Sequence, residues 1–299
     1  MSEPRERSRG HLQGGPRASS QISRVPVPRF LGALAAEIAS GRRAVADPRD
    51  AATVVLLRTA PVGAGIEVLL LCRGRAMDFA PGAHVFPGGS VDPRDGELAG
   101  LPDEAELSEV LGLPPSRCRA IVGAAVRETF EECGVLLAGD GAGPPDPADR
   151  AALLAGTDSL ADLLSRRGLA VRGDVLIPWG RWITPEVSDR RYDTWFFVAA
   201  MPEGQIADAG LSLAGDGVAE ADSAVWLPPG EALREARAGA MTLLPPTAVT
   251  LAELASFASV AEVLAQRRTI EPRMPTVLVE DGSEEQVWLV MPEGVEYPL

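Results

Sequence analysis

The residues with the clearest capacity for chemistry lie in one short stretch, from Arg127 to Val135. It holds three glutamates, Glu128, Glu131 and Glu132, and small and apolar residues precede it. This pattern predicts a helix that ends at Gly134, because glycine is the usual residue just beyond a helix C-terminus. On a helix, the spacing i, i+3, i+4 places the three carboxylates on one face.

Carboxylates that share a helix face repel one another, which raises their pKa values and destabilises the helix. A hard divalent cation with oxygen ligands, Mg²⁺ or Mn²⁺, relieves that repulsion. A solvated acidic face, with Arg127 paired to Glu131 one turn away, accounts for the same spacing without a metal. The spacing alone therefore leaves both interpretations open.

A second stretch, His84 to Asp95, lies upstream and contains the adjacent glycines Gly88 and Gly89. Glycines allow close approach of the backbone, and exposed backbone groups can bind phosphate or a metal. Together the two stretches resemble the box of the Nudix hydrolases: Gly, five residues, Glu, seven residues, then Arg-Glu-U-x-Glu-Glu-x-Gly-U, where U is bulky and apolar. Gly89 takes the place of the box glycine, and the second half of the box matches from Arg127 to Val135.

The chain departs from the box in three ways. Asp95 stands where the family has Glu, and Thr129 replaces a bulky apolar residue. About two dozen extra residues separate Asp95 from Arg127. The resemblance therefore leaves the role of Asp95 undetermined.

The resemblance implies metal-dependent hydrolysis of a nucleoside diphosphate linked to another group. The implied ligands of Mg²⁺ or Mn²⁺ are the carboxylates of Glu128, Glu131 and Glu132 and the carbonyl of Gly89. Arg127 and Gly134 are assigned structural roles, Arg127 by orienting Glu131. One carboxylate must accept the proton of the attacking water. The candidates are Glu131 and Glu132 on the helix and, from loops, Glu186 and Glu220.

The stretch around Arg73 and the Phe-Pro-Gly-Gly run resembles the coenzyme A diphosphatases, and is most similar to the peroxisomal Nudix type 19 branch, whose box also carries an insertion. Gly74 replaces the Ser that usually follows the Arg. The implied substrate is coenzyme A or acyl-coenzyme A, cleaved to 3′,5′-ADP and (acyl-)4′-phosphopantetheine. Alternatives are an ADP-ribose or NADH pyrophosphatase and, in another class, a non-catalytic nucleotide-sensing Nudix-like binding protein. The expected substrate contacts are the exposed backbone groups of Gly88 and Gly89 and the side chains of three arginines, Arg73, Arg190 and Arg191. The arginines are candidates because guanidinium groups suit diphosphates.

Composition restricts the partners. The formal net charge of −14 argues against a broad nucleic-acid or membrane surface, since phosphate binding needs local positive charge. Three cysteines without a metal-site pattern favour free thiols and a reducing compartment, so we expect a cytoplasmic protein. The expected partner is a small nucleotide, and the resemblance to Nudix proteins suggests a possible homodimer.

The order of the elements that must position these residues fits a mixed sheet between helices. With the resemblance, we expect an α/β (α+β) fold with a Nudix-type mixed β-sheet sandwiched between helices. We expect a flexible tail over 1–28 and a single domain over 29–299, with a box insertion at about 96–116 and a C-terminal helix and hairpin extension. Ser116 is the candidate N-cap of the box helix. Expected strands span 53–58, 66–72, 175–185, 190–199, 224–227, 276–279 and 286–290; expected helices span 30–38, 103–111, 147–154, 159–164, 229–238 and 247–267.

Overall fold

The computed structural model describes residues 23–61, 65–75, 80–139, 145–208, 221–280 and 286–299. Its centre is a nine-stranded mixed sheet with the order β10-β6-β7-β2-β3-β4-β9, in which β5 also pairs with β2 and β8 with β3. The strands are β2 (Arg49–Thr59), β3 (Ile66–Arg73), β4 (Ala83–Val85), β5 (Gly88–Ser90), β6 (Ile177–Ile183), β7 (Tyr192–Ala200), β8 (Ala221–Leu227), β9 (Thr242–Leu243) and β10 (Pro272–Arg273).

The central strands are apolar on both faces. Along β2, Val54 and Leu56 belong to one buried cluster, whereas Val55 and Leu57 belong to a second. The strands β3 and β7 divide their side chains between the same two clusters. Because successive side chains of a strand point to opposite faces, each cluster occupies one side of the sheet, and both sides need a cover.

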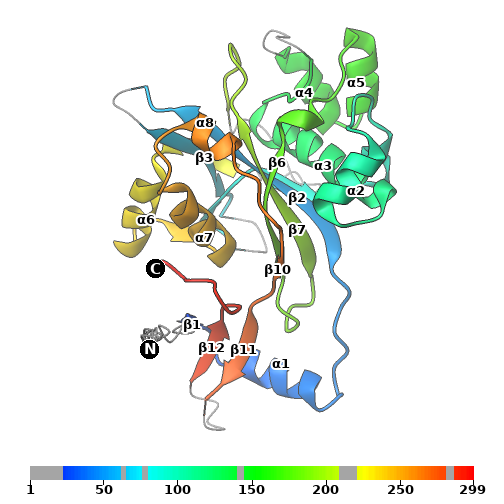
Figure 1. Ribbon diagram of the computed structural model, residues 1–299. Helices are drawn as coiled ribbons and strands as arrows, with labels where there is room; N and C mark the ends of the chain where they lie inside the picture. The colour runs from blue at the N-terminus through cyan, green and yellow to red at the C-terminus, as the bar shows by residue number, and fades with distance from the viewer. Residues whose placement is uncertain (1–22, 62–64, 76–79, 140–144, 209–220, 281–285) are drawn as a thin grey trace, which may run out of the picture.

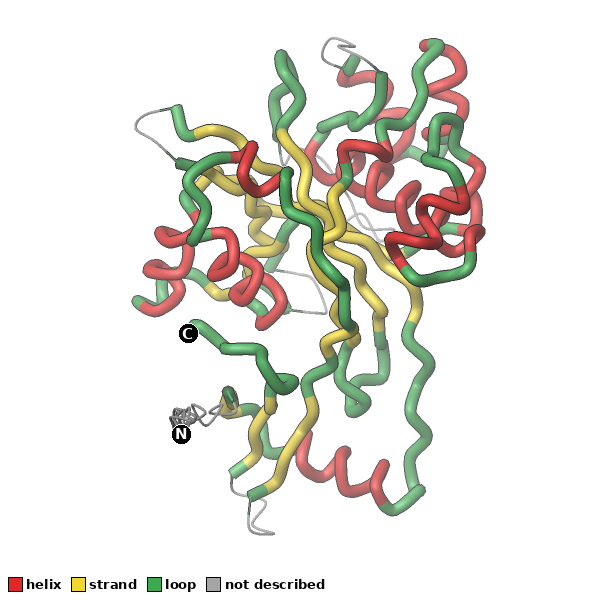
Figure 2. The backbone as a smooth tube through the Cα atoms, in the orientation of Figure 1, coloured by secondary structure: helices red, strands yellow, loops and turns green. Residues whose placement is uncertain are grey.

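Helices cover both faces of the sheet (Figures 1 and 2). One group lies with the first cluster: the helices α2 (Glu104–Leu111), α3 (Pro115–Cys133), α4 (Pro147–Leu154) and α5 (Leu160–Arg167), and the 3-10 turns η1 (Pro93–Glu97) and η2 (Gly173–Val175). The other group lies with the second cluster: α6 (Pro229–Arg237), α7 (Pro245–Leu254) and α8 (Val260–Leu264). This arrangement confirms the predicted mixed sheet between helices.

A second, three-stranded sheet has the order β1-β12-β11, formed by β1 (Arg24–Pro26), β12 (Val287–Val290) and β11 (Thr276–Val279). The helix α1 (Phe30–Ala39) packs on it, with Gly32 against Val279 and Val287. The predicted pairing of the last two strands is confirmed; its turn at Asp281 lies outside the described residues. The prediction of a tail up to residue 28 is wrong for 24–26, because β1 pairs with β12, a partner distant in sequence.

The predicted long helix over 247–267 is two helices. Ser259 caps α8: its hydroxyl accepts a hydrogen bond from the backbone N–H of Glu262 at 3.2 Å. In return, the Glu262 carboxylate accepts from the N–H of Ala258 at 2.9 Å. These two hydrogen bonds hold the start of a new helix after the bend, and Phe257 in the bend packs edge-on against Trp179.

Two further observations concern the helices. The helix α3 begins at Pro115, with Pro114 at the N-cap position, so Ser116 lies inside the helix and does not cap it. Proline is favoured at the first helical position, since its missing N–H would have no partner there. None of the helices within the described ranges is both long enough and apolar enough to cross a bilayer.

Candidate active site

The box helix α3 carries the glutamates on its half-exposed side. Ten of its residues are buried, and eight of these belong to the cluster between α3 and the sheet. The helix ends at Gly134, which has a left-handed φ of 71° and donates its N–H to the carbonyl of Phe130. The predicted helix end at Gly134 is thus observed.

Arg127 is the centre of the polar cluster on α3. Its side chain is only 17% exposed and faces three carboxylates. Its Nη1 lies 2.7 Å from Oε2 of Glu131 and 2.9 Å from Oε1 of Glu128. Its Nε donates to Asp95 at 2.8 Å, and its Nη2 donates to the carbonyl of Ser90 at 2.9 Å. Burial alone would lower the pKa of Arg127, but the hydrogen bond to Asp95 and the surrounding negative charges raise it above its ordinary value.

Asp95 reaches this cluster although the insertion separates it from Arg127 in sequence. It lies in η1, is 3% exposed, and also accepts from the N–H of Asp92 at 2.7 Å. The turn packs directly on α3 at Gly123, where a Cβ atom would overlap the carbonyl oxygen of Asp95. The chain thus contacts α3 first at η1, then runs through the insertion, and enters α3 itself at Pro115. The insertion does not separate Asp95 from Arg127 in space.

Glu128 lies between α3 and the glycine strand β5. A Cβ atom at Gly89 would lie 2.5 Å from its carboxyl carbon, so only glycine leaves room for this carboxylate. The Glu128 side chain is 13% exposed. Burial raises the pKa of Glu128 to about 7; Arg127 opposes this shift, and the negative charges of Glu131 and Asp95 add to it.

Glu132 turns toward the same strand. Its Oε2 accepts a hydrogen bond from the backbone N–H of Gly88 at 2.8 Å. The strand β5 is in turn fixed on β2, with Gly89 opposite Ala52. Glu131 and Glu128 thus lie beside Arg127, and Glu128 and Glu132 lie beside the glycines of β5.

The donor atoms of this region fit a hard divalent cation in their chemistry. Three carboxylates and a backbone carbonyl are all oxygen donors, which Mg²⁺ and Mn²⁺ prefer. Across the described parts of the chain, no three His, Cys, Asp or Glu side chains converge on one point as metal ligands do. Arg127 holds Glu128 and Glu131, and Gly88 holds Glu132. Binding a cation would therefore exchange these hydrogen bonds for metal bonds.

Of the other predicted site residues that the structure describes, Arg73 lies at the end of a strand, and Glu186 and Arg190 lie in a loop. Arg73 ends β3, which runs antiparallel to β2, so Arg73 lies toward the same end of the sheet as β5. Glu186 and Arg190 are exposed in the connection between β6 and β7. Glu220 lies outside the described residues.

Arg191 has an interior position. Its guanidinium donates to the carbonyls of Thr184 and Ala46, at 3.0 and 2.7 Å, and contacts the sulfur of Met274. It is 7% exposed. Arg191 precedes Trp195, the residue level with Gly89 across β2, by four positions, which corresponds to about 13 Å along a strand. The structure therefore places Arg191 among backbone carbonyls, away from the carboxylates of α3.

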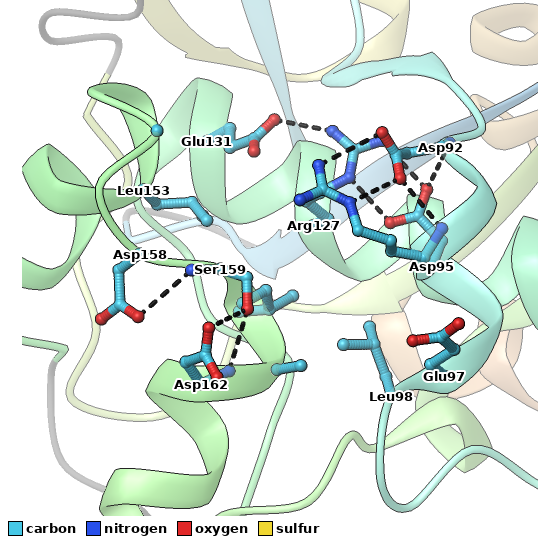
Figure 3. Close-up of a pocket in the computed structure, with 14 residues that line it drawn as sticks. Asp92, Asp95, Glu97, Leu98, Arg127, Glu131, Leu153, Asp158, Ser159 and Asp162 are labelled. Carbon is cyan, nitrogen blue, oxygen red and sulfur yellow. Dashed lines mark hydrogen bonds and ion pairs between the residues drawn. The ribbon is translucent and has the colours of Figure 1, made fainter.

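A cavity of about 380 Å³ opens beside Arg127 and Glu131 (Figure 3). Its far wall is the start of α5, with Asp158, Ser159 and Asp162, a region that sequence reasoning did not connect with the box. A serine at position 159, just before an apolar stripe, predicts a helix start, and Ser159 does cap α5. The local sequence does not show that the start of α5 lies across the cavity from Arg127 and Glu131. The lining residues are Asp92, Arg94, Asp95, Glu97, Leu98, Arg127, Glu131, Leu153, Gly156, Asp158, Ser159, Leu160, Ala161 and Asp162.

Comparison with known proteins shows what this chain is similar to. The chain matches no protein-family model. It is 29% identical over 252 residues to the acyl-coenzyme A diphosphatase NUDT19 of Homo sapiens, covering 68% of this chain and 64% of that protein. It is 33% identical over 192 residues to the putative nudix hydrolase 7 of Caenorhabditis elegans, covering 63% of this chain and 55% of that protein. The chain thus spans a little over half to about two thirds of the length of these two relatives.

Among solved structures, the chain is similar to the NUDIX hydrolase from Alicyclobacillus acidocaldarius, with 34% sequence identity and a TM-score of 0.62. That match covers 75% of this chain and 98% of the solved chain. It therefore includes nearly all of the other protein. The chain belongs to the Nudix hydrolase family.

Proposed function

We propose that this protein hydrolyses the diphosphate linkage of coenzyme A or acyl-coenzyme A, with Mg²⁺ or Mn²⁺, to give 3′,5′-ADP and (acyl-)4′-phosphopantetheine. The observation that carries the proposal is the set of carboxylates on α3: Arg127 holds Glu128 and Glu131, and the N–H of Gly88 in β5 holds Glu132. The choice of substrate is supported by the similarity to the acyl-coenzyme A diphosphatase NUDT19. It is also supported by the Phe-Pro-Gly-Gly run at β5.

The residues that would hold the cation are Glu128, Glu131 and Glu132, with the carbonyl of Gly89. A bound cation neutralises phosphate charge and lowers the pKa of the attacking water. The protein contributes the placement of the carboxylates. Arg127 fixes Glu131 through a bond of 2.7 Å, and the close approach at Gly89 leaves Glu128 against the strand.

The remaining roles concern the proton and the phosphates. One carboxylate accepts the proton of the attacking water; Glu131 and Glu132 are the candidates on α3, and Glu186 and Glu220 are the loop candidates. Arg73, at the β5 end of the sheet, is the proposed contact for the substrate phosphates, because a guanidinium fork pairs well with phosphate oxygens.

The test is a turnover screen of the purified protein with Mg²⁺ or Mn²⁺. The panel contains coenzyme A, an acyl-coenzyme A, ADP-ribose, NADH and a nucleoside triphosphate, with products separated by chromatography. We expect 3′,5′-ADP from coenzyme A or its acyl form. Preferential cleavage of ADP-ribose or NADH would keep the box chemistry and refute the coenzyme A assignment. Nucleotide binding without any turnover would instead support a sensor.

A variant pair tests the assignment of the carboxylates. Glu132→Gln removes one charge from α3 and is expected to abolish turnover, while the folded protein keeps its circular dichroism spectrum and melting temperature. Glu235→Gln makes the same chemical change on α6, on the opposite face of the sheet, and is expected to keep wild-type turnover. Unchanged activity in Glu132→Gln would refute the metal assignment.

A further inference from the structure

The last turn of α3 carries Glu131 and Glu132, so its orientation decides where both carboxylates point. The last four carbonyl groups of any α-helix lack partners within that helix. Here the N–H of Gly134 donates a hydrogen bond to the carbonyl of Phe130 at 2.9 Å. The carbonyls of Glu131 and Cys133 are bound by groups from other parts of the chain, outside the box.

Arg150 on α4 supplies the main external contact. Its Nε and Nη2 both donate to the carbonyl oxygen of Glu131, at 3.0 and 2.8 Å. Its Nη1 donates to the carbonyl of Asp208 at 3.2 Å, and the N–H of Asp208 donates to the carbonyl of Cys133 at 2.9 Å. One guanidinium therefore connects α4, the end of α3 and the segment at Asp208.

A second pair of bonds holds the chain just after the helix. The side chain of Gln205 accepts from the N–H of Leu136 at 2.9 Å and donates to its carbonyl at 3.0 Å. Since Gln205 and Asp208 lie on the same segment, the last turn of α3 and the residues that follow it are fixed from one side. The turn is therefore held at several points, and Arg150 makes the contact from α4.

Gly134 fits this arrangement in two ways. Its φ of 71° is strained for any other residue. A Cβ atom there would also lie 3.3 Å from Nη1 of Arg150, which is tighter than an ordinary contact. The box glycine thus ends the helix and also leaves room for the guanidinium of Arg150.

We propose that Arg150 is a positioning residue, which fixes the last turn of α3 and so sets the directions of the Glu131 and Glu132 carboxylates. The role requires arginine, because a planar fork reaches two carbonyls at once, whereas lysine offers a single point of charge. A positive group at a helix C-terminus is also favoured by the helix dipole. The expected effect on turnover rests on the proposed function; the expected effect on the carboxylates does not.

The experiment compares Arg150→Met and Arg150→Lys with the control Arg166→Met. The ion pairs of Arg166 run to Asp149 and Asp158, outside α3. Three quantities are measured: kcat and KM for coenzyme A with Mg²⁺, the dissociation constant of Mn²⁺ by electron paramagnetic resonance, and hydrogen exchange of the amides over 130–136. The last two need no substrate.

We expect Arg150→Met to lower kcat by about 10- to 100-fold with little change in KM, as is usual when the partner of a metal-ligand residue is removed. Mn²⁺ affinity should fall by a similar factor, and exchange over 130–136 should accelerate. Arg150→Lys should lie between Arg150→Met and the wild type in each quantity, because lysine keeps the positive charge but lacks the planar guanidinium fork. Arg166→Met should match the wild type in all three.

Wild-type Mn²⁺ affinity and wild-type exchange in Arg150→Met would overturn the proposal. Full recovery in Arg150→Lys would also overturn it, because charge alone would then suffice. If Arg150→Met does not fold, Arg150→Lys decides the question by the same two readouts. A wild-type protein that cleaves none of the substrates refutes the proposed function, while Mn²⁺ binding and exchange still decide the role of Arg150.

Discussion

The contact between η1 and α3 makes a sharp prediction for Gly123→Ala. Gly123 is buried within α3, and a methyl group there would overlap the carbonyl oxygen of Asp95 and lie 2.7 Å from its carbonyl carbon. The neighbour is backbone, so it cannot turn away as the end of a long side chain can. The turn η1 must therefore shift, and Asp95 must shift with it, away from Arg127.

The magnitude follows from three opposing effects. Replacing glycine by alanine within a helix stabilises it by about 1 kcal/mol. Forcing an extra carbon into a packed interior costs about 1–3 kcal/mol. Weakening the charged hydrogen bonds between Asp95 and Arg127 costs about 1.5–3 kcal/mol more. The free energy of unfolding should fall by about 1.5–5 kcal/mol, and at about 2 °C per kcal/mol for a chain of this size the melting temperature should fall by about 3–10 °C.

The assay is urea and thermal denaturation of Gly123→Ala beside a matched control, Gly230→Ala. Gly230 lies in the first turn of α6, and a Cβ atom there meets nothing within 4 Å. The control should stay within about 1 kcal/mol of the wild type. If Gly123→Ala is as stable as Gly230→Ala, the docking of η1 on α3 does not hold Asp95 in place and the reasoning fails.

Two further predictions concern the thiols and the pH dependence of stability. In the native protein a thiol reagent should modify Cys72 quickly and leave Cys118 and Cys133 until unfolding, because both are fully buried and burial raises the pKa of Cys133 to about 12; rapid reaction of all three would contradict this. Burial lowers the pKa of His84 below 6.5, so the unfolded chain binds a proton that the folded chain does not, and stability should be lost as the pH falls below about 6.5. The loss of melting temperature between pH 7.5 and pH 5.5 should be smaller in His84→Gln, and an equal loss would exclude His84 as its source.

Much of the fold follows from local pattern. The sequences of β2, β3 and β7 place apolar side chains on both faces of the strand, which is the pattern of strands buried in the middle of a sheet. The end of α3 at Gly134 follows from glycine alone. These features depend on residues that are close in sequence, and local physics decides them.

The errors arise where distant contacts decide. Residues 24–26 have little to bury by themselves and become a strand because β12 offers an edge. Arg190 and Arg191 look equivalent in sequence, but strand pairing buries Arg191 against Thr184 and Ala46 and leaves Arg190 exposed. The break before α8 was readable, since Ser259 and Glu262 have the spacing of a capping box, and the apolar periodicity across 247–267 concealed it.

Within the site, the carboxylate face of α3 could be read from spacing, whereas the partner of Asp95 could not. Nothing local shows that the chain returns after the insertion to place Asp95 on Arg127. One signal was available: Gly123 stands in the middle of a helical pattern, where glycine costs about 1 kcal/mol, and such a glycine usually marks a close packing contact. Arg150 had no signal, since its partner is a backbone carbonyl on another helix.

The return of the insertion to α3 has a consequence for how its length can vary. Since η1 is docked at one end and α3 begins at the other, the intervening chain is a closed loop with both ends fixed. The entropy of closing such a loop grows only with the logarithm of its length, so doubling it costs about 0.6 kcal/mol. Residues can therefore be added to the exposed stretch between α2 and α3 at small thermodynamic cost, while Asp95 and Arg127 keep their distance. Removal of α2 would cost more, because Leu107 and Leu111 are buried in the first cluster. For this box, the contact between the two side chains defines the site, and the number of residues between them does not.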